Sequence, residues 1–113
     1  MEPARIIMKD ADQNAYLFRV YPLGVPFKDV GGCYAFTRQD QDGWFIAYIG
    51  QTNSLAGRFD AHDKQLSHFK NLGITHVAVR VNESESVRVM EEEALVSFYN
   101  PPCNAQQQLA AAA

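Results

Sequence analysis

The sequence is poor in cysteine and in positive charge, and it has no long apolar run. Its two cysteines, Cys33 and Cys103, do not form a CxxC pair, which argues against a structural zinc site and against a disulfide scaffold. We therefore expect two reduced cysteines in a cytoplasmic protein. No apolar run approaches the ~18 residues that a membrane span needs, and the first ten residues are too polar for a secretory signal.

The net charge of the chain bears on whether it binds nucleic acid. Ten lysines and arginines against 13 aspartates and glutamates give a net charge of −3, whereas nucleic-acid-binding domains are usually basic. The acidic excess lies after Val81, and no region of the chain is strongly basic. Any binding to nucleic acid should therefore be weak, salt-sensitive, or assisted by a metal ion or a protein partner.

The chain has the length of one domain, and its pattern predicts a small α+β fold. Alternating aromatic and β-branched residues predict strands over 33–38, 44–51 and 74–81, the first two as a hairpin. Residues 15–21 are compatible with a further strand. We expect an antiparallel sheet of about three strands flanked by helices, preceded by an extension over 1–30 that can add an edge strand. Residues 105–113 are rich in Gln and Ala and show no hydrophobic pattern that would pack on the domain, so we expect a flexible tail there.

Two helices are predicted. The first follows three good N-cap residues at 52–54, and Gly73 is a suitable residue to end it. Its apolar stripe has helical spacing and consists of Leu55, Phe59, His62, Leu66 and Phe69. The second helix runs over 87–99 and ends at the sequence Asn-Pro-Pro.

Glu92 is out of place on the second helix. With a step of ~100° per residue, Leu95, Val96 and Tyr99 fall within about 60° of Glu92, whereas its two glutamate neighbours lie about 100° to either side. We therefore interpret Glu91 and Glu93 as a solvated flank and place Glu92 on the apolar face. A slight rotation of the helix could return Glu92 to solvent. A buried carboxylate otherwise needs a partner or a metal ion, because burying it alone costs several kcal/mol.

Arg58 and His62 are likewise polar residues on or beside the apolar face of the first predicted helix. A lone histidine on an apolar stripe is more often a satisfied core residue than a catalytic one. Arg58 lies one turn before His62, and two groups that can carry positive charge near a helix N-terminus can form a phosphate site. Tyr34 and Tyr48 lie on the neighbouring strands, where each alone would be a core or rim residue. By alternation, Tyr48 shares a face with Ile46 and Gly50.

These residues together resemble the GIY-YIG nuclease superfamily. The chain has GCY at 32–34, and YIGQTNSLAGR over 48–58 fits the family form YIG-x-T-x-x-L-x-x-R. The segment EEALVSFYNPPCN over 92–104 resembles the family ending E-x-x-L-I…P-x-x-N, with Val96 in place of Ile. The family spacing selects Glu92, as the helical pattern does. A histidine four residues after the motif arginine, here His62, occurs in part of the family.

The resemblance covers residues 31–104, with some departures. The first motif is GCY rather than GIY, and the segment between the two tyrosines, TRQDQDGWFIA, is longer than in compact members. The first 30 residues have no counterpart. We interpret Cys33 and Cys103, each of which precedes a candidate site residue, as packing residues, because alternation turns Cys33 away from the face of Tyr34.

The resemblance implies metal-dependent hydrolysis of phosphodiester bonds by a site made of Tyr34, Tyr48, Arg58, His62, Glu92 and Asn104. Glu92 would hold one Mg²⁺ or Mn²⁺ that keeps several waters, and Arg58 would bind the non-bridging oxygens. Either tyrosine could take a proton from the attacking water, His62 could share that role or orient the phosphate, and Asn104 would fix the geometry.

The resemblance implies a nucleic-acid substrate, and we expect DNA. The sequence leaves open whether the substrate is single-stranded, duplex or branched. The competing interpretation is a nucleic-acid-binding or adaptor module without activity. Against that alternative, no catalytic side chain expected from the family is missing. Because the chain has no basic patch in its sequence, we expect poor sequence specificity or recruitment by a protein partner.

Overall fold

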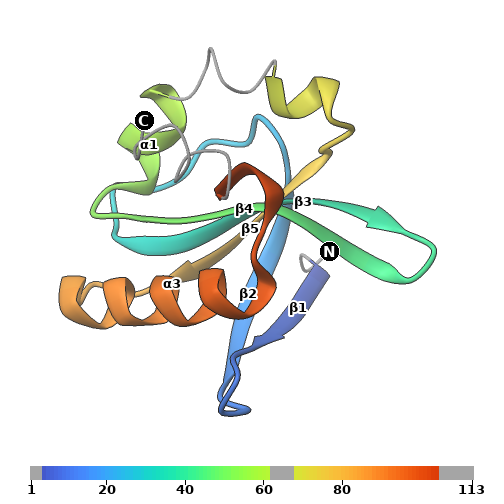
Figure 1. Cartoon of the computed structure of the whole chain (residues 1–113). Helices are drawn as coiled ribbons and strands as arrows, with labels where there is room; N and C mark the ends of the chain where they lie inside the picture. The colour runs from blue at the N-terminus through green and yellow to red at the C-terminus, as the bar shows by residue number, and fades with distance from the viewer. Residues whose placement is uncertain (1–3, 62–67, 105–113) are drawn as a thin grey trace, which may run out of the picture.

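The computed structural model describes residues 4–61 and 68–104, which form one twisted antiparallel sheet with helices on its two faces (Figure 1). The strands lie in the order β1-β2-β5-β3-β4. Their bounds are β1 Ala4–Lys9, β2 Ala15–Pro22, β3 Gly32–Asp40, β4 Gly43–Thr52 and β5 His76–Val81, and the helices named below are α1 Leu55–Ala61 and α3 Glu85–Tyr99. No helix in this part of the chain is long and apolar enough to cross a membrane.

The prediction of a sheet of about three strands flanked by helices is wrong. The sheet has five strands, and α1 has only seven residues, so strand rather than helix dominates the fold. β2 confirms the further strand expected over 15–21, and with β1 it forms a hairpin that joins the sheet through the pairing of β2 with β5. β1 is the edge strand that the extension over 1–30 was expected to be able to add. Its bounds were not predicted, because Ile6 and Ile7 are adjacent apolar residues, which hides the alternation of an edge strand with only one face buried.

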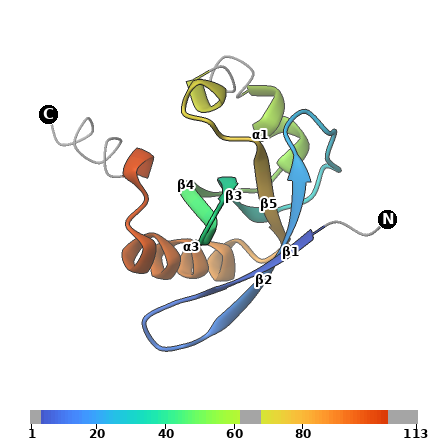
Figure 2. The same cartoon turned by 90° about the vertical axis from the view of Figure 1, so that its right-hand side faces the viewer.

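The sheet carries a hydrophobic core on each face. On one face, Leu95 of α3 packs on Cys33, Ala35, Ile49 and residues of the β1–β2 hairpin. On the other face, α1 and the segment after β2 cover an aromatic cluster built on Tyr34, Phe36, Leu55, Phe59 and Phe69. Figures 1 and 2 show α3 and α1 on opposite sides of the sheet. Cys33 and Tyr34 therefore lie in different cores, as strand alternation predicts.

A β-bulge changes the predicted facing of β4. Phe36 pairs with Tyr48, but the next residue of β3, Thr37, pairs with Ile46, so Ala47 is the extra residue. Ala47 and Tyr48 consequently pack in the same aromatic core, whereas Ile46 packs in the core under α3. The prediction that Ile46 and Tyr48 share a face is wrong, because simple alternation does not hold across a bulge.

The start and end of α3 are fixed by local contacts. The Ser84 hydroxyl accepts a hydrogen bond from the backbone N–H of Val87, and Asn100 ends the helix in the left-handed conformation with φ 46°. Pro101 follows and cannot continue the helix. The predicted helix over 87–99 is thus confirmed, with two more residues at its start.

The predictions on His62 and on the flexible tail over 105–113 fall outside the described residues. The same applies to the middle of the first predicted helix, of which α1 and a short helical segment at 68–71 are described.

Candidate functional site

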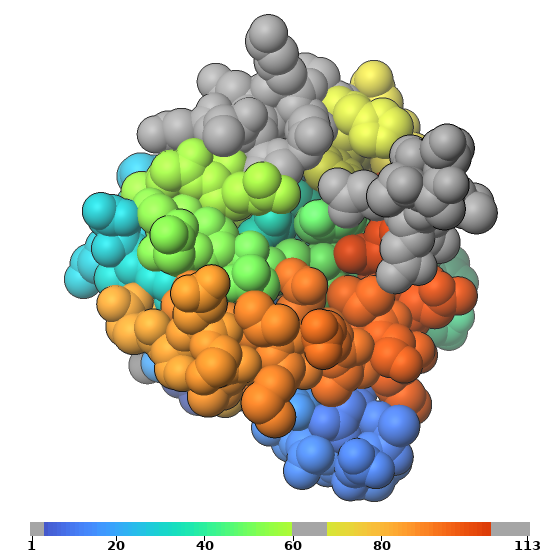
Figure 3. Space-filling model, turned by 60° about the vertical axis from the view of Figure 1, so that its left-hand side comes forward, coloured from blue at the N-terminus to red at the C-terminus, as the bar shows by residue number. Residues whose placement is uncertain are grey.

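The candidate site lies at the end of β4, where both helices reach the edge of the sheet. β4 is an edge strand, so alternate backbone groups of its last residues point away from β3. On this edge, the C-terminal segment and α3 supply hydrogen-bonding partners to Ile49 and Gln51. Figure 3 views this side of the molecule, with α3 in orange along the green end of β4 and the start of α1.

Arg58 of α1 is held by Tyr34 of β3. The Arg58 Nε–H donates a hydrogen bond of 2.7 Å to the Tyr34 hydroxyl oxygen, and the guanidinium carbon lies 5.9 Å from the centre of the Tyr34 ring. Tyr34 is fully buried, and Arg58 is partly exposed. The contact therefore fixes one side of a guanidinium group whose other side can reach solvent.

Gly50 makes room for this contact. It lies directly opposite Tyr34 in the register of β3 and β4. A Cβ atom at position 50 would lie 2.6 Å from the Tyr34 hydroxyl oxygen and 3.0 Å from Cε1 of Tyr48. Any side chain larger than glycine would thus displace one of the two tyrosines, which explains why the sequence has glycine inside a strand here.

The two tyrosines differ in their access to solvent. Their ring centres are 6.2 Å apart in the same core, but only Tyr48 lines the pocket beside α3. Burial raises the pKa of the Tyr34 hydroxyl to about 12, although the hydrogen bond from Arg58 opposes the shift. Tyr34 therefore remains a neutral phenol near neutral pH, and its visible contact is with Arg58 rather than with the pocket.

Glu92 reaches the site from the opposite face of the sheet. It lines a pocket of about 450 Å³. Tyr48 of β4, Asn104 and further residues of α3 line the same pocket. The pKa of the Glu92 carboxyl is raised, mainly by burial and also by the negative charge of Glu93. A hydrogen bond from the backbone N–H of Gln51 and the positive charge of Arg58 act in the opposite direction and lower this pKa. The carboxylate is thus half-buried, held by β4, and close enough to Arg58 to sense its charge.

The surroundings of Glu92 fit a hydrated Mg²⁺ or Mn²⁺ ion. The described residues contain no cluster of three or more His, Cys, Asp or Glu that could enclose a metal ion. Mg²⁺ does not require such a cluster, because it usually keeps several waters and binds one or two carboxylates. The pocket leaves space for those waters, and Glu93 lines the same pocket as a second acidic group. A divalent cation would offset the raised pKa that burial and Glu93 give Glu92.

Asn104 ties the C-terminal segment to the edge of β4. Its Nδ2–H donates to the Ile49 carbonyl oxygen at 2.8 Å, and its Oδ1 accepts from the Ile49 N–H at 2.8 Å. The side chain thus satisfies both backbone groups of an edge residue, as a neighbouring strand would. Since Ile49 is adjacent to Tyr48, this pair of hydrogen bonds holds the strand at the pocket.

We expect Asn104→Ala to lower the free energy of unfolding by about 2 kcal/mol, because two part-buried hydrogen bonds are lost at about 1 kcal/mol each. Urea denaturation would measure the loss, and hydrogen exchange would show faster exchange of the Ile49 amide in the variant. Asn53→Ala, at an exposed position, is the matched control and should change neither quantity. Unchanged protection of the Ile49 amide in Asn104→Ala would contradict the assignment.

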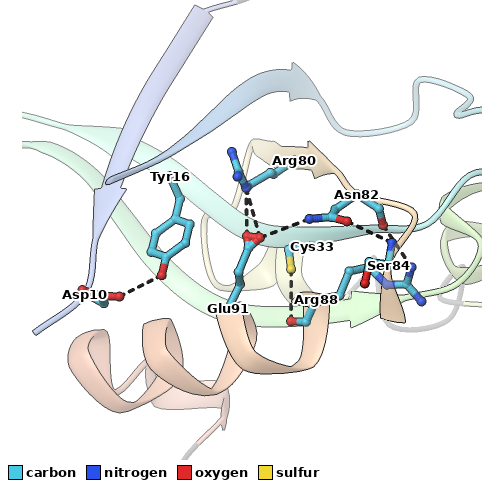
Figure 4. A network of polar contacts seen from close by, with 8 residues as sticks. All are labelled: Asp10, Tyr16, Cys33, Arg80, Asn82, Ser84, Arg88 and Glu91. Atoms are coloured by element: carbon cyan, nitrogen blue, oxygen red, sulfur yellow. Dashed lines mark hydrogen bonds and ion pairs between the residues drawn. The ribbon is translucent and has the colours of Figure 1, made fainter. Parts of the chain in front are cut away.

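Glu91 corrects the predicted flank of α3. It is buried rather than solvated, and its Oε2 lies 3.0 Å from Nε of Arg80 on β5. Asn82 Nδ2 lies 3.5 Å from Oε1 of Glu91 (Figure 4). The helical pattern identified the face of Glu92, but it could not show that β5 places an arginine opposite the neighbouring glutamate. Of the three glutamates at 91–93, only Glu93 is exposed.

Both cysteines are packing residues by their environment. Burial raises the pKa of the Cys33 thiol to about 12, with the charges of Glu91 and Glu92 adding to the shift. Its S–H donates to the carbonyl oxygen of Arg88 at 3.6 Å (Figure 4). Burial also raises the pKa of Cys103, which packs against the aromatic core. Neither thiol is activated, since a reactive cysteine needs a lowered pKa.

Arg88 and Gln51 are two supporting residues that the sequence analysis missed. Arg88 is buried, and its Nε–H donates to the side-chain oxygen of Gln51 at 3.2 Å. The backbone N–H of Gln51 in turn donates to Glu92. Arg88 precedes Glu92 by four residues, which places it about 40° from Glu92 on the helix. The helical argument that selected Glu92 therefore also applies to Arg88.

The structure brings together five of the six candidate residues, namely Tyr34, Tyr48, Arg58, Glu92 and Asn104, around the end of β4. The sixth, His62, lies outside the described residues. Comparison of the chain with protein-family models, with curated proteins and with solved structures finds no match.

Proposed function

We propose that this chain is a metal-dependent endonuclease of GIY-YIG type that hydrolyses phosphodiester bonds in nucleic acid, with DNA as the expected substrate. The observation that carries the proposal is the hydrogen bond of 2.7 Å between Arg58 and Tyr34, beside a pocket shared by Tyr48 and Glu92. These residues come from separate segments, and the motif resemblance selects each of them. A structural domain would not require an arginine, a carboxylate and an accessible phenol to meet at one sheet edge.

Glu92 is the residue that would hold the metal ion. When bound there, Mg²⁺ or Mn²⁺ would supply positive charge that neutralises the phosphate and stabilises the leaving oxygen. The hydrogen bond from the backbone N–H of Gln51 orients the carboxylate before the ion or the substrate arrives. Arg88 fixes the side chain of Gln51 from behind, so the carboxylate is supported by a second group of contacts.

Arg58 would bind the scissile phosphate. Its Nε–H donates to Tyr34 and a further side-chain hydrogen bond links Arg58 to Tyr48, and the remaining N–H groups would bind the non-bridging oxygens. Their interaction with phosphate strengthens as negative charge builds in the transition state. Tyr34 has a positioning role, because it is fully buried and touches Arg58.

Tyr48 is the tyrosine that would act on the attacking water. It is partly exposed and lines the pocket with Glu92. In hydrolysis, the water oxygen forms a bond to phosphorus, the bond from phosphorus to one ester oxygen breaks, and that oxygen gains a proton. The water would give one proton to the Tyr48 oxygen as the Tyr48 hydroxyl passes its own proton to solvent, and the leaving oxygen would take its proton from solvent. The products are a phosphate monoester end and a hydroxyl end.

The test is cleavage of labelled single-stranded, duplex and branched DNA with Mg²⁺, with Mn²⁺ or with EDTA. We expect cutting with either metal ion and none with EDTA, because the ion would supply the positive charge that balances the leaving oxygen. Arg58→Ala should abolish cutting in the same preparation. The preferred DNA structure would identify the substrate class.

The absence of cutting on DNA and RNA under all metal conditions would contradict the proposal and favour a binding module without activity. Cutting that persists in EDTA, or in Arg58→Ala, would indicate a contaminating nuclease or a different site. The wild-type protein and the variant therefore have to be purified in parallel and assayed at equal concentration.

A further inference from the structure

The face of the β1–β2 hairpin that points away from α3 is exposed and carries positive charge without negative charge. We call this face the basic strip. Its residues alternate along the two strands and oppose one another in the register: Arg5, Ile7 and Lys9 on β1, and Arg19, Leu17 and Ala15 on β2. Ile7 is 62% exposed and Leu17 is 40% exposed, so neither the charges nor the apolar side chains are covered by the described part of the chain.

The segregation of charge in the hairpin is not visible in the sequence, where Arg5, Lys9 and Arg19 are interspersed with Asp10 and Asp12. The opposite face of the hairpin packs in the core with Met8, Phe18 and Val20. Asp10, one of the two acids of the hairpin, accepts a hydrogen bond of 2.8 Å from the hydroxyl of Tyr16 beside that core (Figure 4). A strand period of two residues thus separates the cations from the acid. The protein has a net charge of −3, so this local grouping is opposite in sign to the whole chain.

A groove continues the basic strip toward α1. It has a volume of about 650 Å³ and is lined by Arg19 and Tyr21 of β2, by Phe27 and Lys28 of the segment after β2, and by Leu55 at the start of α1, among others. Arg19 and Lys28 make no ion pair with any residue between 4 and 61 or 68 and 104. Tyr21 and Phe27 pack edge to face with ring centres 5.5 Å apart.

We propose that the basic strip and this groove bind a single strand of nucleic acid, with the phosphates on Arg19 and Lys28 and bases against the aromatic and aliphatic side chains of the groove. This inference rests on the proposed function, because it assigns the place where the substrate is held away from the reacting bond. Charge complementarity selects the occupant: two cations without an ionic partner beside apolar and aromatic walls match a backbone of phosphates that carries flat, weakly polar bases.

The groove is also coupled to the catalytic arginine. The segment that forms one wall accepts two hydrogen bonds from the start of α1. The Leu55 N–H donates to the carbonyl oxygen of Val30 at 2.9 Å, and the Ala56 N–H donates to that of Lys28 at 3.2 Å. Arg58 follows in the same helix. A nucleic-acid strand bound to Lys28 therefore contacts the segment that is hydrogen-bonded to the helix of Arg58. This contact would retain the substrate even though the protein carries little positive charge.

The test is binding of a fluorescent single-stranded oligonucleotide in EDTA, followed by anisotropy at several salt concentrations. We expect Arg19→Gln to raise Kd about fivefold at low salt and to lower the slope of log K against log salt by about 0.7, the value for one phosphate contact on a single strand. Lys70→Gln is the matched control. It removes the same charge from an exposed residue outside the basic strip and the groove, and it should change neither quantity.

Equal Kd values and salt slopes for wild type, Arg19→Gln and Lys70→Gln would overturn the inference. They would favour a protein partner as the ligand of the basic strip. Unchanged thermal midpoints would show that all three proteins are folded. Cleavage with Mg²⁺ separates this inference from the proposed function. Cutting with no effect of Arg19→Gln on KM refutes the groove alone, whereas binding that depends on Arg19 without any cutting refutes the nuclease alone.

Discussion

Glu92→Gln is expected to lower the rate of metal-dependent cleavage at least about 100-fold, whereas Glu91→Gln is expected to leave it within about twofold of wild type. Glu92 lines the pocket with Tyr48, and it is the residue proposed to hold the metal ion. A bound metal ion supplies several kcal/mol of transition-state stabilisation, and each 1.4 kcal/mol corresponds to about tenfold in rate. Glutamine has almost the same shape but lacks the charge that holds the ion.

The same two substitutions should have the opposite order of effect on stability. Burial raises the pKa of Glu92 in the folded protein. A carboxyl with a raised pKa stabilises the fold below its unfolded pKa, and that contribution is lost as the pH rises through the folded pKa. Near pH 7 the ionised Glu92 therefore opposes folding, and Glu92→Gln should leave the free energy of unfolding equal or higher, measured in EDTA.

Glu91→Gln should lower the free energy of unfolding by about 1–2 kcal/mol. It removes the ion pair with Arg80 at 3.0 Å, in which the Glu91 side chain is 7% exposed and that of Arg80 is 32% exposed. Urea denaturation measures the free energy of unfolding of each variant, and single-turnover cleavage measures its rate. Loss of cleavage in Glu91→Gln with retention in Glu92→Gln would refute the assignment of the site.

Much of the candidate site could be predicted because its residues break local rules. Glu92 interrupts an apolar helix face, Gly50 interrupts a strand, and Asn100 with the two prolines that follow it marks the end of α3. Each of these signals is local in sequence, and the structure gives each a physical reason. Gly50, for instance, is required by a tyrosine that lies opposite it across the sheet.

The features that could not be predicted depend on contacts between distant segments. The burial of Glu91 depends on Arg80, which another strand supplies. The bulge at Ala47 changes which residues of β4 share a face, and nothing in the local composition marks it. The basic strip arises because β1 pairs with β2, so that charges of both signs that lie close together along the chain are separated in space. The number of strands was missed for the same reason, since pairing rather than propensity makes residues 4–9 a strand.

Arg58→Lys is expected to lower the cleavage rate about 100- to 1,000-fold, even though it keeps the positive charge. A lysine cannot donate to Tyr34 and to a phosphate in the fixed planar geometry of a guanidinium group. The magnitude is that of losing a preorganised donor to a developing oxyanion. Arg38→Lys is the matched control, because Arg38, like Arg58, donates a hydrogen bond and lies near an aromatic ring. Its acceptor is the Leu72 carbonyl oxygen at 3.0 Å, and its guanidinium carbon lies 4.2 Å from the centre of the Phe45 ring. It lies outside the candidate site, and its rate should stay within about twofold of wild type.

Tyr34→Phe tests whether Tyr34 acts through Arg58. Phenylalanine fills the same buried space but removes the acceptor of the hydrogen bond of 2.7 Å, so we expect kcat to fall about tenfold with little change in KM. In the Arg58→Lys background, the same substitution should have almost no further effect on kcat, because the interaction that it breaks is already gone. Additive losses in the double variant would show instead that Tyr34 has a role independent of Arg58. The full cycle, measured with saturating Mg²⁺ on one DNA substrate, therefore decides between a positioning tyrosine and a second catalytic group.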